Sequence, residues 1–286
     1  LRLKEAERAQ LDEFIKNRQS GKAEIFVHDK YFSEGNSSAV LEQTLALDKD
    51  KRNIFLFSNL YWDVGLSERG GLFDGVIDWI LKTIDIVIQE PNCHLYIKPH
   101  PAEVFGSAGS LKGIHQIISE TYPNALSNVT IIEPEWKIRP YDLFPYIDVG
   151  TIFNGTLGLE MMLAGIPVIS TGLTTHDGLG LSIEPKTVHS YRAALVGEVA
   201  TPEVDRAKLE LFAYFYFIRA LIPWRLTKTA YANSGFDGFE IESLDDLEPG
   251  RDLCLDHLCN CILNQENTVI EGWPDEIALR GRAVNP

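Results

Sequence analysis

Asn154-Gly155-Thr156-Leu157-Gly158-Leu159-Glu160 is the stretch of sequence that decides the fold. It follows the apolar run Gly150–Phe153 and leads into a helix-like segment, Leu159–Ala164, that ends at a glycine. A second apolar run, Pro167–Ser170, comes directly afterwards. The order of strand, glycine turn, helix and strand is typical of a parallel α/β sheet.

Individual residues of this stretch are suited to binding a nucleotide. Gly155 and Gly158 leave room for a ligand to approach the backbone. Asn154 and Thr156 are residue types that begin helices, and the free N–H groups of a first helical turn suit a phosphate. Glu160 can accept hydrogen bonds from a ribose diol, or it can offset the helix dipole. Strand–glycine–helix turns also occur in domains that bind nothing, so this stretch alone leaves both interpretations open.

The wider pattern predicts a doubly wound parallel α/β sheet, because apolar runs alternate with helix-like segments between residues 53 and 172. The expected strands are Asn53–Ser58, His94–Lys98, Val129–Ile132, Gly150–Phe153 and Pro167–Ser170. We expect three parts. Residues 1–52 form an N-terminal helical and connecting segment, residues 53–200 a Rossmann-like domain, and residues 201–286 a helical extension with a tail.

Polar residues collect where the expected strands end. They occur in Asn59–Asp63, Lys98–Glu103, Glu133–Glu135 and Asn154–Glu160. In open parallel sheets ligands bind beyond the carboxyl ends of the strands. We therefore expect a histidine, a lysine, a helix N-terminus and several carboxylates to meet at one rim.

Lys98-Pro99-His100-Pro101 is the most informative of these rim segments. The two prolines restrict the chain just past a strand and fix where His100 points. An imidazole beside a diphosphate can donate a hydrogen bond to it, and Lys98 could add a point charge. A histidine that bonds only to backbone is the structural alternative. The flanking prolines favour the phosphate interpretation.

Four other rim residues have weaker signals. Asn59 and Asp63 follow the first strand, and Asp63 could accept hydrogen bonds from sugar hydroxyls or act as a base, or could equally cap a helix. Glu133 could contact a base or ribose, or could be a solvated strand end. His176 lies in a glycine-rich loop, where it could touch the sugar or phosphate, and a solvated loop explains it equally well.

Composition limits the classes of function. The net charge of −15 at pH 7 argues against a nucleic-acid groove. There is no P-loop motif and no zinc-type histidine spacing, so we expect no metal and no bound cofactor. The four cysteines read as buried, reduced thiols, and the apolar run Leu209–Ile222 is too short to span a bilayer. We expect a cytoplasmic location, with peripheral attachment to the inner face of the cell membrane as an option.

The motifs together resemble the capsule polysaccharide biosynthesis family, which includes the Kdo transferases. The resemblance rests on Asn59-x-x-Trp62-Asp63, Lys98–Glu103, Asn154–Glu160, Ala164–Ile169 and a glycine-rich loop before Glu184-Pro185. More distantly, the chain is similar to other GT-B enzymes with a His-Pro motif: bacterial sialyltransferases, teichoic acid glycerophosphotransferases and UDP-GlcNAc 2-epimerases.

This resemblance covers about residues 53–191 and implies the donor-binding, Rossmann-like half of a GT-B glycosyltransferase. It implies that His100, Pro101 and the turn at 154–158 hold the phosphates of a nucleotide sugar, with Glu160 near the ribose. The donor could be CMP-Kdo, and the acceptor a glycan or glycolipid of the bacterial surface. Only 52 residues precede Asn53, so we expect the chain to be either a fragment or a single domain that works with another Rossmann half or a partner subunit.

Other functions stay open at this point. A CDP-glycerol-type phosphotransferase and a UDP-sugar 2-epimerase would share the His-Pro element, and an epimerase would need additional acid/base carboxylates. A non-catalytic nucleotide-binding module is the third possibility. In an enzyme, we expect His100 and Asp63 to be the catalytic residues.

Overall fold

A computed structural model of the chain describes residues 1–20, 38–62, 71–105, 111–124, 126–136, 138–222, 226–230 and 235–269. These residues belong to two compact units. One unit is Asp29–Leu209, and the other combines Leu1–His28 with Glu210–Pro286. All of the strands predicted between residues 53 and 170 lie in the unit Asp29–Leu209, which is described first.

The predicted parallel sheet is confirmed. Its strands are β1 (Arg52–Phe57), β2 (Cys93–Lys98), β3 (Val129–Ile131), β4 (Val149–Ile152) and β5 (Val168–Ser170). They pair in the order β3-β2-β1-β4-β5, and every pairing is parallel. The chain winds outward from β1 to β3 and then resumes on the other side of β1 with β4. The topological switch point therefore lies between β1 and β4.

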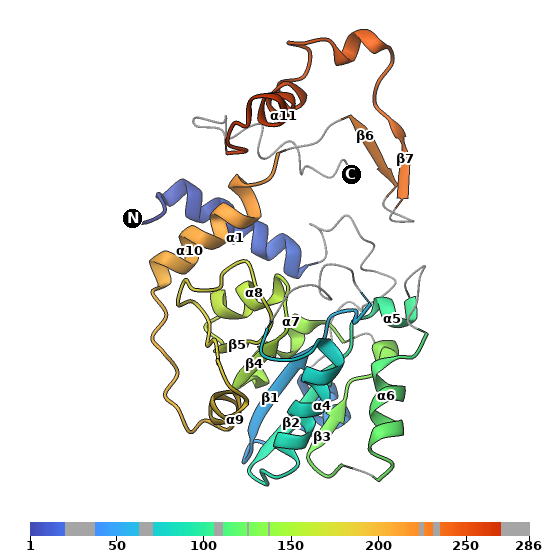
Figure 1. The fold of residues 1–286 in the computed structure, drawn as a ribbon, viewed down its shortest axis with the longest axis vertical. Helices are drawn as coiled ribbons and strands as arrows, with labels where there is room; N and C mark the ends of the chain where they lie inside the picture. The colour runs from blue at the N-terminus through green and yellow to red at the C-terminus, as the bar shows by residue number, and fades with distance from the viewer. Residues whose placement is uncertain are drawn as a thin grey trace. The chain divides into compact units, whose positions relative to one another are not determined.

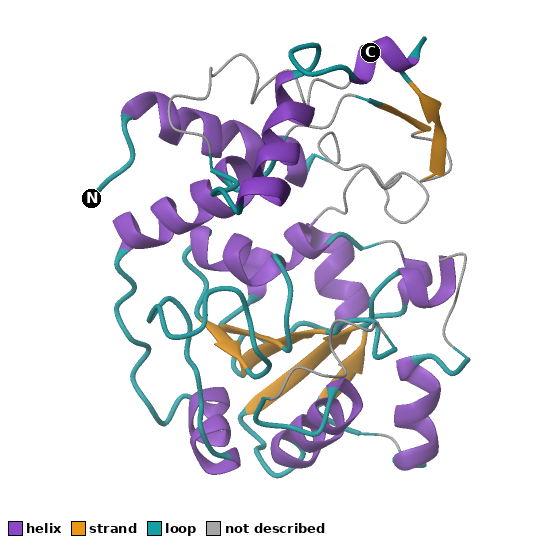
Figure 2. Cartoon of the chain, turned by 45° about the horizontal axis from the view of Figure 1, so that its top comes forward, coloured by secondary structure: helices purple, strands orange, loops and turns teal. Residues whose placement is uncertain are grey.

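Helices lie on both faces of this sheet (Figures 1 and 2). Tyr191 of α9 (Val188–Val196) and Trp79 of α4 (Val76–Val87) meet Thr151 on one face of β4. Met161 of α8 (Leu157–Leu163) approaches Gly150 on the opposite face. The remaining helices of this unit are α2 (Ser38–Leu45), α5 (Ala102–Phe105), α6 (Ile114–Thr121) and α7 (Pro140–Leu143), with 3-10 turns at Pro134–Trp136 and Phe144–Tyr146.

A group of buried hydroxyls crosslinks α4, α9 and β4. The Trp79 indole N–H donates to the Tyr191 hydroxyl oxygen over 2.9 Å, and Thr83 Oγ1 lies 2.8 Å from the same oxygen. Thr151 Oγ1 is 3.2 Å away, and none of the four side chains is exposed. Thr83 donates its own hydrogen to the Trp79 carbonyl, so the Tyr191 hydroxyl donates to Thr83 and accepts from Trp79 and Thr151. Every polar atom in the group is satisfied.

The other unit joins the two ends of the chain. Helix α1 (Glu5–Gln19) contacts the segment that follows Glu210: the Phe14 and Phe217 rings are 5.1 Å apart, and the Tyr214 hydroxyl donates to Gln10 over 2.8 Å. The further elements are α10 (Arg206–Tyr214), which begins in the first unit, a π-helical turn (Phe215–Arg219), β6 (Thr227–Ala230), β7 (Gly235–Phe239), a 3-10 turn (Leu244–Leu247) and α11 (Leu253–Asn264).

Two expectations for the C-terminal part and the cysteines need correction. The segment 201–286 contains strands besides helices, because β6 and β7 form an antiparallel pair. The apolar run Leu209–Ile222 is α-helical to Tyr214 and continues as a π-helical turn. Not every cysteine is buried, because Cys259 is exposed on α11. No helix among the described residues is both long and apolar enough to cross a bilayer.

Candidate functional site

The switch point brings Asn59 and Asn154 together. Asn59 follows β1 and Asn154 follows β4, and the Asn154 backbone N–H donates to Asn59 Oδ1 over 3.3 Å. The Asn154 side-chain oxygen in turn accepts the Gly155 N–H over 2.7 Å. In doubly wound sheets the crevice at the switch point is where ligands bind. Two of the predicted rim segments therefore meet at the expected place.

The two glycines of the turn have different reasons to be glycine. Gly155 is exposed and has a φ of 117°, a backbone conformation that side chains strain against. Gly158 lies in the first turn of α8 and is buried, and a Cβ there would lie 2.4 Å from Ile152 Cδ1 and 3.7 Å from Val168 Cγ1. The expectation that Gly158 leaves room for a ligand is therefore wrong, because this glycine allows α8 to pack closely on the sheet.

Helix α8 starts earlier than the sequence suggested, at Leu157 rather than Leu159, with Thr156 as its N-cap. The Thr156 side chain makes no capping hydrogen bond. Glu160 of the first turn is almost wholly buried, and its carboxylate accepts a 2.5 Å hydrogen bond from the Tyr141 hydroxyl of α7. The burial of Glu160, rather than a lack of lone pairs, therefore limits its access to a ribose diol.

Lys98 and His100 lie close in sequence but in different surroundings. Lys98 is 4% exposed, and burial lowers the pKa of its ammonium to about 8, although the charge of Asp142 acts in the opposite direction. His100 is exposed, and its Nδ1 accepts the Ala102 backbone N–H over 3.1 Å. With Nδ1 as acceptor, the neutral ring carries its hydrogen on Nε2. The structural alternative thus accounts for one ring nitrogen, and Nε2 is a donor.

The remaining rim residues are placed as follows. Pro101 is half-buried and begins the turn that leads into α5, where its carbonyl accepts the Val104 N–H. Glu133 pairs with His115 Nδ1 of α6 over 2.6 Å. Asp63 lies outside the described residues. Among the described residues, no group of three or more His, Cys, Asp or Glu side chains is arranged to hold a metal ion.

His176 does not lie in a solvated loop. It is 1% exposed, and its Nε2 is 3.2 Å from Ser170 Oγ at the end of β5. Burial lowers the pKa of His176, against the charges of Asp177 and Glu184. The imidazole thus fastens the glycine-rich loop to β5, and its neighbours rather than His176 itself face the adjoining pocket.

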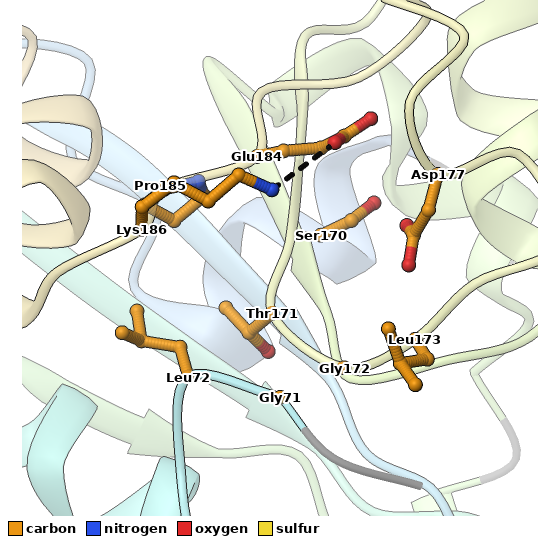
Figure 3. A pocket seen from close by; sticks show the side chains of 10 residues that line it. All are labelled: Gly71, Leu72, Ser170, Thr171, Gly172, Leu173, Asp177, Glu184, Pro185 and Lys186. Atoms are coloured by element: carbon orange, nitrogen blue, oxygen red, sulfur yellow. Dashed lines mark hydrogen bonds and ion pairs between the residues drawn. The ribbon is translucent and has the colours of Figure 1, made fainter.

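That pocket lies beyond the end of β5 and has a volume of about 350 Å³ (Figure 3). It adjoins the switch point, because the Gly172 N–H bonds to the carbonyl of Phe153, the residue before Asn154. Gly71 pairs with Gly172 and closes one side. The lining residues are Gly71, Leu72, Ser170, Thr171, Gly172, Leu173, Asp177, Glu184, Pro185 and Lys186.

Two carboxylates of the pocket are held by the loop itself. Asp177 accepts the backbone N–H and the hydroxyl of Thr174, over 2.9 and 2.5 Å. Glu184 accepts the Gly178 N–H over 2.9 Å and lies 3.4 Å from Lys186 Nζ, the pair drawn with a dashed line in Figure 3. Each carboxylate oxygen has two lone pairs, so both groups can still accept hydrogen bonds from a hydroxyl.

Sequence reasoning missed this pocket. None of its lining residues is among the site residues expected from the sequence, although Glu184 and Pro185 follow the glycine-rich loop on which the family resemblance partly rests. The sequence contained one signal of the pocket, the glycines at positions 71 and 172. A Cβ on Gly71 would lie 2.7 Å from the Thr171 carbonyl oxygen, and one on Gly172 would lie 2.4 Å from that of Phe153. Glycines that follow strands can mark such close backbone approaches.

Comparisons with known proteins give only distant likenesses. No protein-family model matches the chain, and no curated protein matches it. Among solved structures, the chain is similar to two KpsC enzymes of Thermosulfurimonas dismutans. For the β-Kdo 2,4 transferase the identity is 18%, the TM-score 0.45, and 74% of this chain and 56% of that chain are covered. For the β-Kdo 2,7 transferase the values are 13%, 0.40, 82% and 58%.

A third solved structure is a UDP-GlcNAc 2-epimerase of Neisseria meningitidis bound to UDP-GlcNAc, with 13% identity and a TM-score of 0.38. The likeness covers 63% of this chain and 47% of the epimerase chain. The chain thus spans about half the length of these structures. At such identities and TM-scores the likeness does not identify what this chain binds.

Proposed function

We propose that the chain binds a nucleotide-activated sugar at the switch point and is the donor-binding part of a GT-B glycosyltransferase. The observation that carries the proposal is the Asn59–Asn154 contact, which joins the ends of β1 and β4 beside an open pocket. A glycine turn, an exposed histidine and a cavity at one edge of a doubly wound sheet are what a phosphate-linked ligand needs.

Each part of the rim would take one part of the donor. His100 Nε2 donates to a phosphate oxygen, and the Asn154–Gly155 turn lets a phosphate approach the backbone. The pocket beyond β5 accommodates the sugar, whose hydroxyls can donate to Asp177 and Glu184. Glu160 is almost wholly buried and bonded to Tyr141, so it reaches the ribose only if Tyr141 moves aside.

In transfer, an acceptor hydroxyl attacks the anomeric carbon, the bond from that carbon to the phosphate oxygen breaks, and the nucleotide leaves. Negative charge grows on the leaving phosphate, where a positioned donor such as His100 Nε2–H stabilises it. A CMP-linked acid sugar such as CMP-Kdo is the first donor to test, and a bacterial surface glycan the first acceptor. The proton of the acceptor hydroxyl passes to a catalytic base, which we propose lies with the acceptor site on another Rossmann half or a partner subunit.

The proposal is tested by calorimetric titration of the chain with CMP, CDP, UDP and GDP and with the phosphate-free nucleosides. We expect one nucleotide to bind and its nucleoside to bind at least about tenfold more weakly, the effect of about one good hydrogen bond. If none of the four nucleotides binds, the proposed function is wrong.

Two variants of His100 separate the role of each ring nitrogen. His100→Asn places an oxygen near the position of Nδ1, so it can keep the bond to Ala102 N–H while losing the donor at Nε2. His100→Gln can place an amide N–H near the position of Nε2. We expect the Asn variant to lose about tenfold in nucleotide affinity and the Gln variant to lose less. Equal affinities in all three proteins would contradict a phosphate contact through Nε2.

An epimerase is the second candidate, because two carboxylates, Asp177 and Glu184, line the pocket as acid/base chemistry on a sugar ring would require. It is distinguished by the nucleotide. Preference for UDP, with hydrogen–deuterium exchange at the sugar carbon in heavy water, supports the epimerase, and preference for CDP supports a CDP-alcohol phosphotransferase. Preference for CMP supports the transferase of acid sugars.

A further inference from the structure

Glu103 connects the turn that carries His100 to the start of helix α6. Its backbone N–H donates to the His100 carbonyl over 3.0 Å. Its side chain reaches in the other direction, where Oε2 accepts the Ile114 N–H over 2.9 Å. The side chain is only 6% exposed. One residue therefore contacts both the segment that follows β2 and the first residue of α6.

The position of the carboxyl group suits this connection. Helix α6 begins after Gly113, which has no side chain with which to cap it. A Cβ on Gly113 would lie 3.4 Å from Glu103 Oε2, an ordinary contact, so the carboxyl group lies directly beside the start of the helix. Glu103 thus supplies from a distance the oxygen that an N-cap side chain normally supplies. The connection matters because α5 (Ala102–Phe105) is a single turn, too short to be stable without tertiary contacts.

The same carboxyl group is costly to bury. Oε1 has no hydrogen-bond partner among the described residues. Burial raises the pKa of the Glu103 carboxyl to about 7, although the Ile114 N–H favours its charged form. A helix start can be capped by an exposed serine or asparagine without this cost. Packing alone therefore gives no reason for a glutamate here.

We propose that Glu103 is a positioning residue for nucleotide binding, which fixes the direction of the His100 imidazole by tying its turn to α6. The inference rests on the proposed function, because it needs His100 to contact a phosphate. His100 Nδ1 accepts from Ala102, the residue next to Glu103, so a shift of α5 moves the ring. Glu103 itself touches no ligand and acts through the histidine.

A double-mutant cycle on nucleotide affinity tests this. The four proteins are the unmodified chain, Glu103→Ala, His100→Ala and the double variant, each titrated with CMP, CDP, UDP and GDP. We expect Glu103→Ala to weaken binding about tenfold in the unmodified background and less than about twofold when His100 is already alanine. Equal losses in both backgrounds would overturn the inference, because Glu103 would then act independently of His100.

Conservative variants separate positioning from direct contact. Glu103→Gln keeps a side-chain oxygen for the Ile114 N–H and removes the charge, so we expect an affinity within about twofold of the unmodified chain. A loss as large as that of Glu103→Ala would mean that the carboxylate charge acts on the ligand, and would also overturn the inference. If Glu103→Ala does not fold, Glu103→Asp replaces it in the cycle, since it retracts the carboxyl group by one methylene.

The cycle also separates this inference from the proposed function. If the unmodified chain binds a nucleotide and His100→Ala weakens it, the proposed function stands whatever Glu103 does. If no nucleotide binds the unmodified chain, both fail together.

Discussion

Removing the hydroxyl of Tyr191 should destabilise the sheet unit strongly. In Tyr191→Phe the ring still packs between α4 and β4, but the Trp79 N–H and the Thr151 hydroxyl lose the oxygen to which they donate. Both groups are wholly buried, so water cannot replace the lost partner. An orphaned buried donor costs about 1–3 kcal/mol. With two such donors, partly relieved by small shifts, we expect unfolding free energy to fall by about 2–4 kcal/mol.

The assay is urea denaturation at pH 7, followed by circular dichroism. Tyr122→Phe is the matched control. The Tyr122 hydroxyl donates to Asp85 Oδ1 over 2.7 Å at the surface, and the Leu81 carbonyl oxygen lies 3.1 Å from it. Water can replace this hydroxyl at Asp85, so we expect Tyr122→Phe to lower the unfolding free energy by less than about 1 kcal/mol. Thr151→Val should recover part of the loss in the Tyr191→Phe background, because it removes one orphaned donor. A Tyr191→Phe loss below about 0.5 kcal/mol would refute the hydrogen-bond accounting.

Three further predictions concern the turns of the rim. Gly158→Ala should lower the unfolding free energy by about 1 kcal/mol and leave nucleotide affinity unchanged, because the new Cβ meets Ile152 Cδ1. The double variant with Ile152→Val should lose less stability than the two single variants lose together, because it removes that methyl group. Gly155→Ala should cost about 1–2 kcal/mol, because its φ is 117°, and should also weaken nucleotide binding in calorimetry. The unfolding free energy of Glu103→Gln should rise relative to that of the unmodified chain as the pH increases from 4.5 through 7, by up to about 3 kcal/mol. Urea titrations of both proteins at pH 5 and 8.5 measure this difference.

The sign of that pH dependence follows from the buried carboxyl group. The pKa of Glu103 is raised from its ordinary value of 4.5 to about 7, so between these values the folded protein holds the proton more often than the unfolded chain. Stability is therefore greatest below the unfolded pKa and is lost as the pH rises through the folded one. A constant stability difference between the two proteins over this range would contradict the burial of Glu103.

The sheet could be predicted because its strands are local signals. Apolar runs such as Asn53–Ser58 and His94–Lys98 are bounded by turn residues, and each became a strand within one or two residues of its expected limits. The polar residues that follow them were placed at the correct edge for the same reason. The order of the strands was not predicted. No local pattern shows that β4 pairs with the edge of β1 opposite to β2 instead of extending the sheet beyond β3.

The orientation of side chains could not be read from the sequence. Lys98, Glu160 and His176 were expected at the rim, and each is buried in the fold. Asp142 lies near the first, Tyr141 bonds to the second and Ser170 to the third. A side chain at a strand end faces solvent or protein according to what packs beside it, and this is a tertiary property.

The pocket could not be predicted from local sequence patterns for a related reason. Its walls form where Gly71 meets Gly172, and neither segment shows by itself that the other will lie against it. Glycine at both positions is compatible with many loops. Only the pairing explains why a side chain fits at neither.

Three of the five tryptophans lie among the described residues, and they provide two kinds of optical probe. Trp79 is wholly shielded and bonded to Tyr191, so its emission should be blue-shifted and should respond only when the sheet unfolds. Trp62 and Trp136 follow β1 and β3 at the rim and are 43% and 40% exposed, so a bound base can quench them. Selective excitation at the red edge would favour these wetter indoles. One fluorescence experiment could then follow both ligand occupancy, by quenching of Trp62 and Trp136, and folding, by a spectral shift of Trp79.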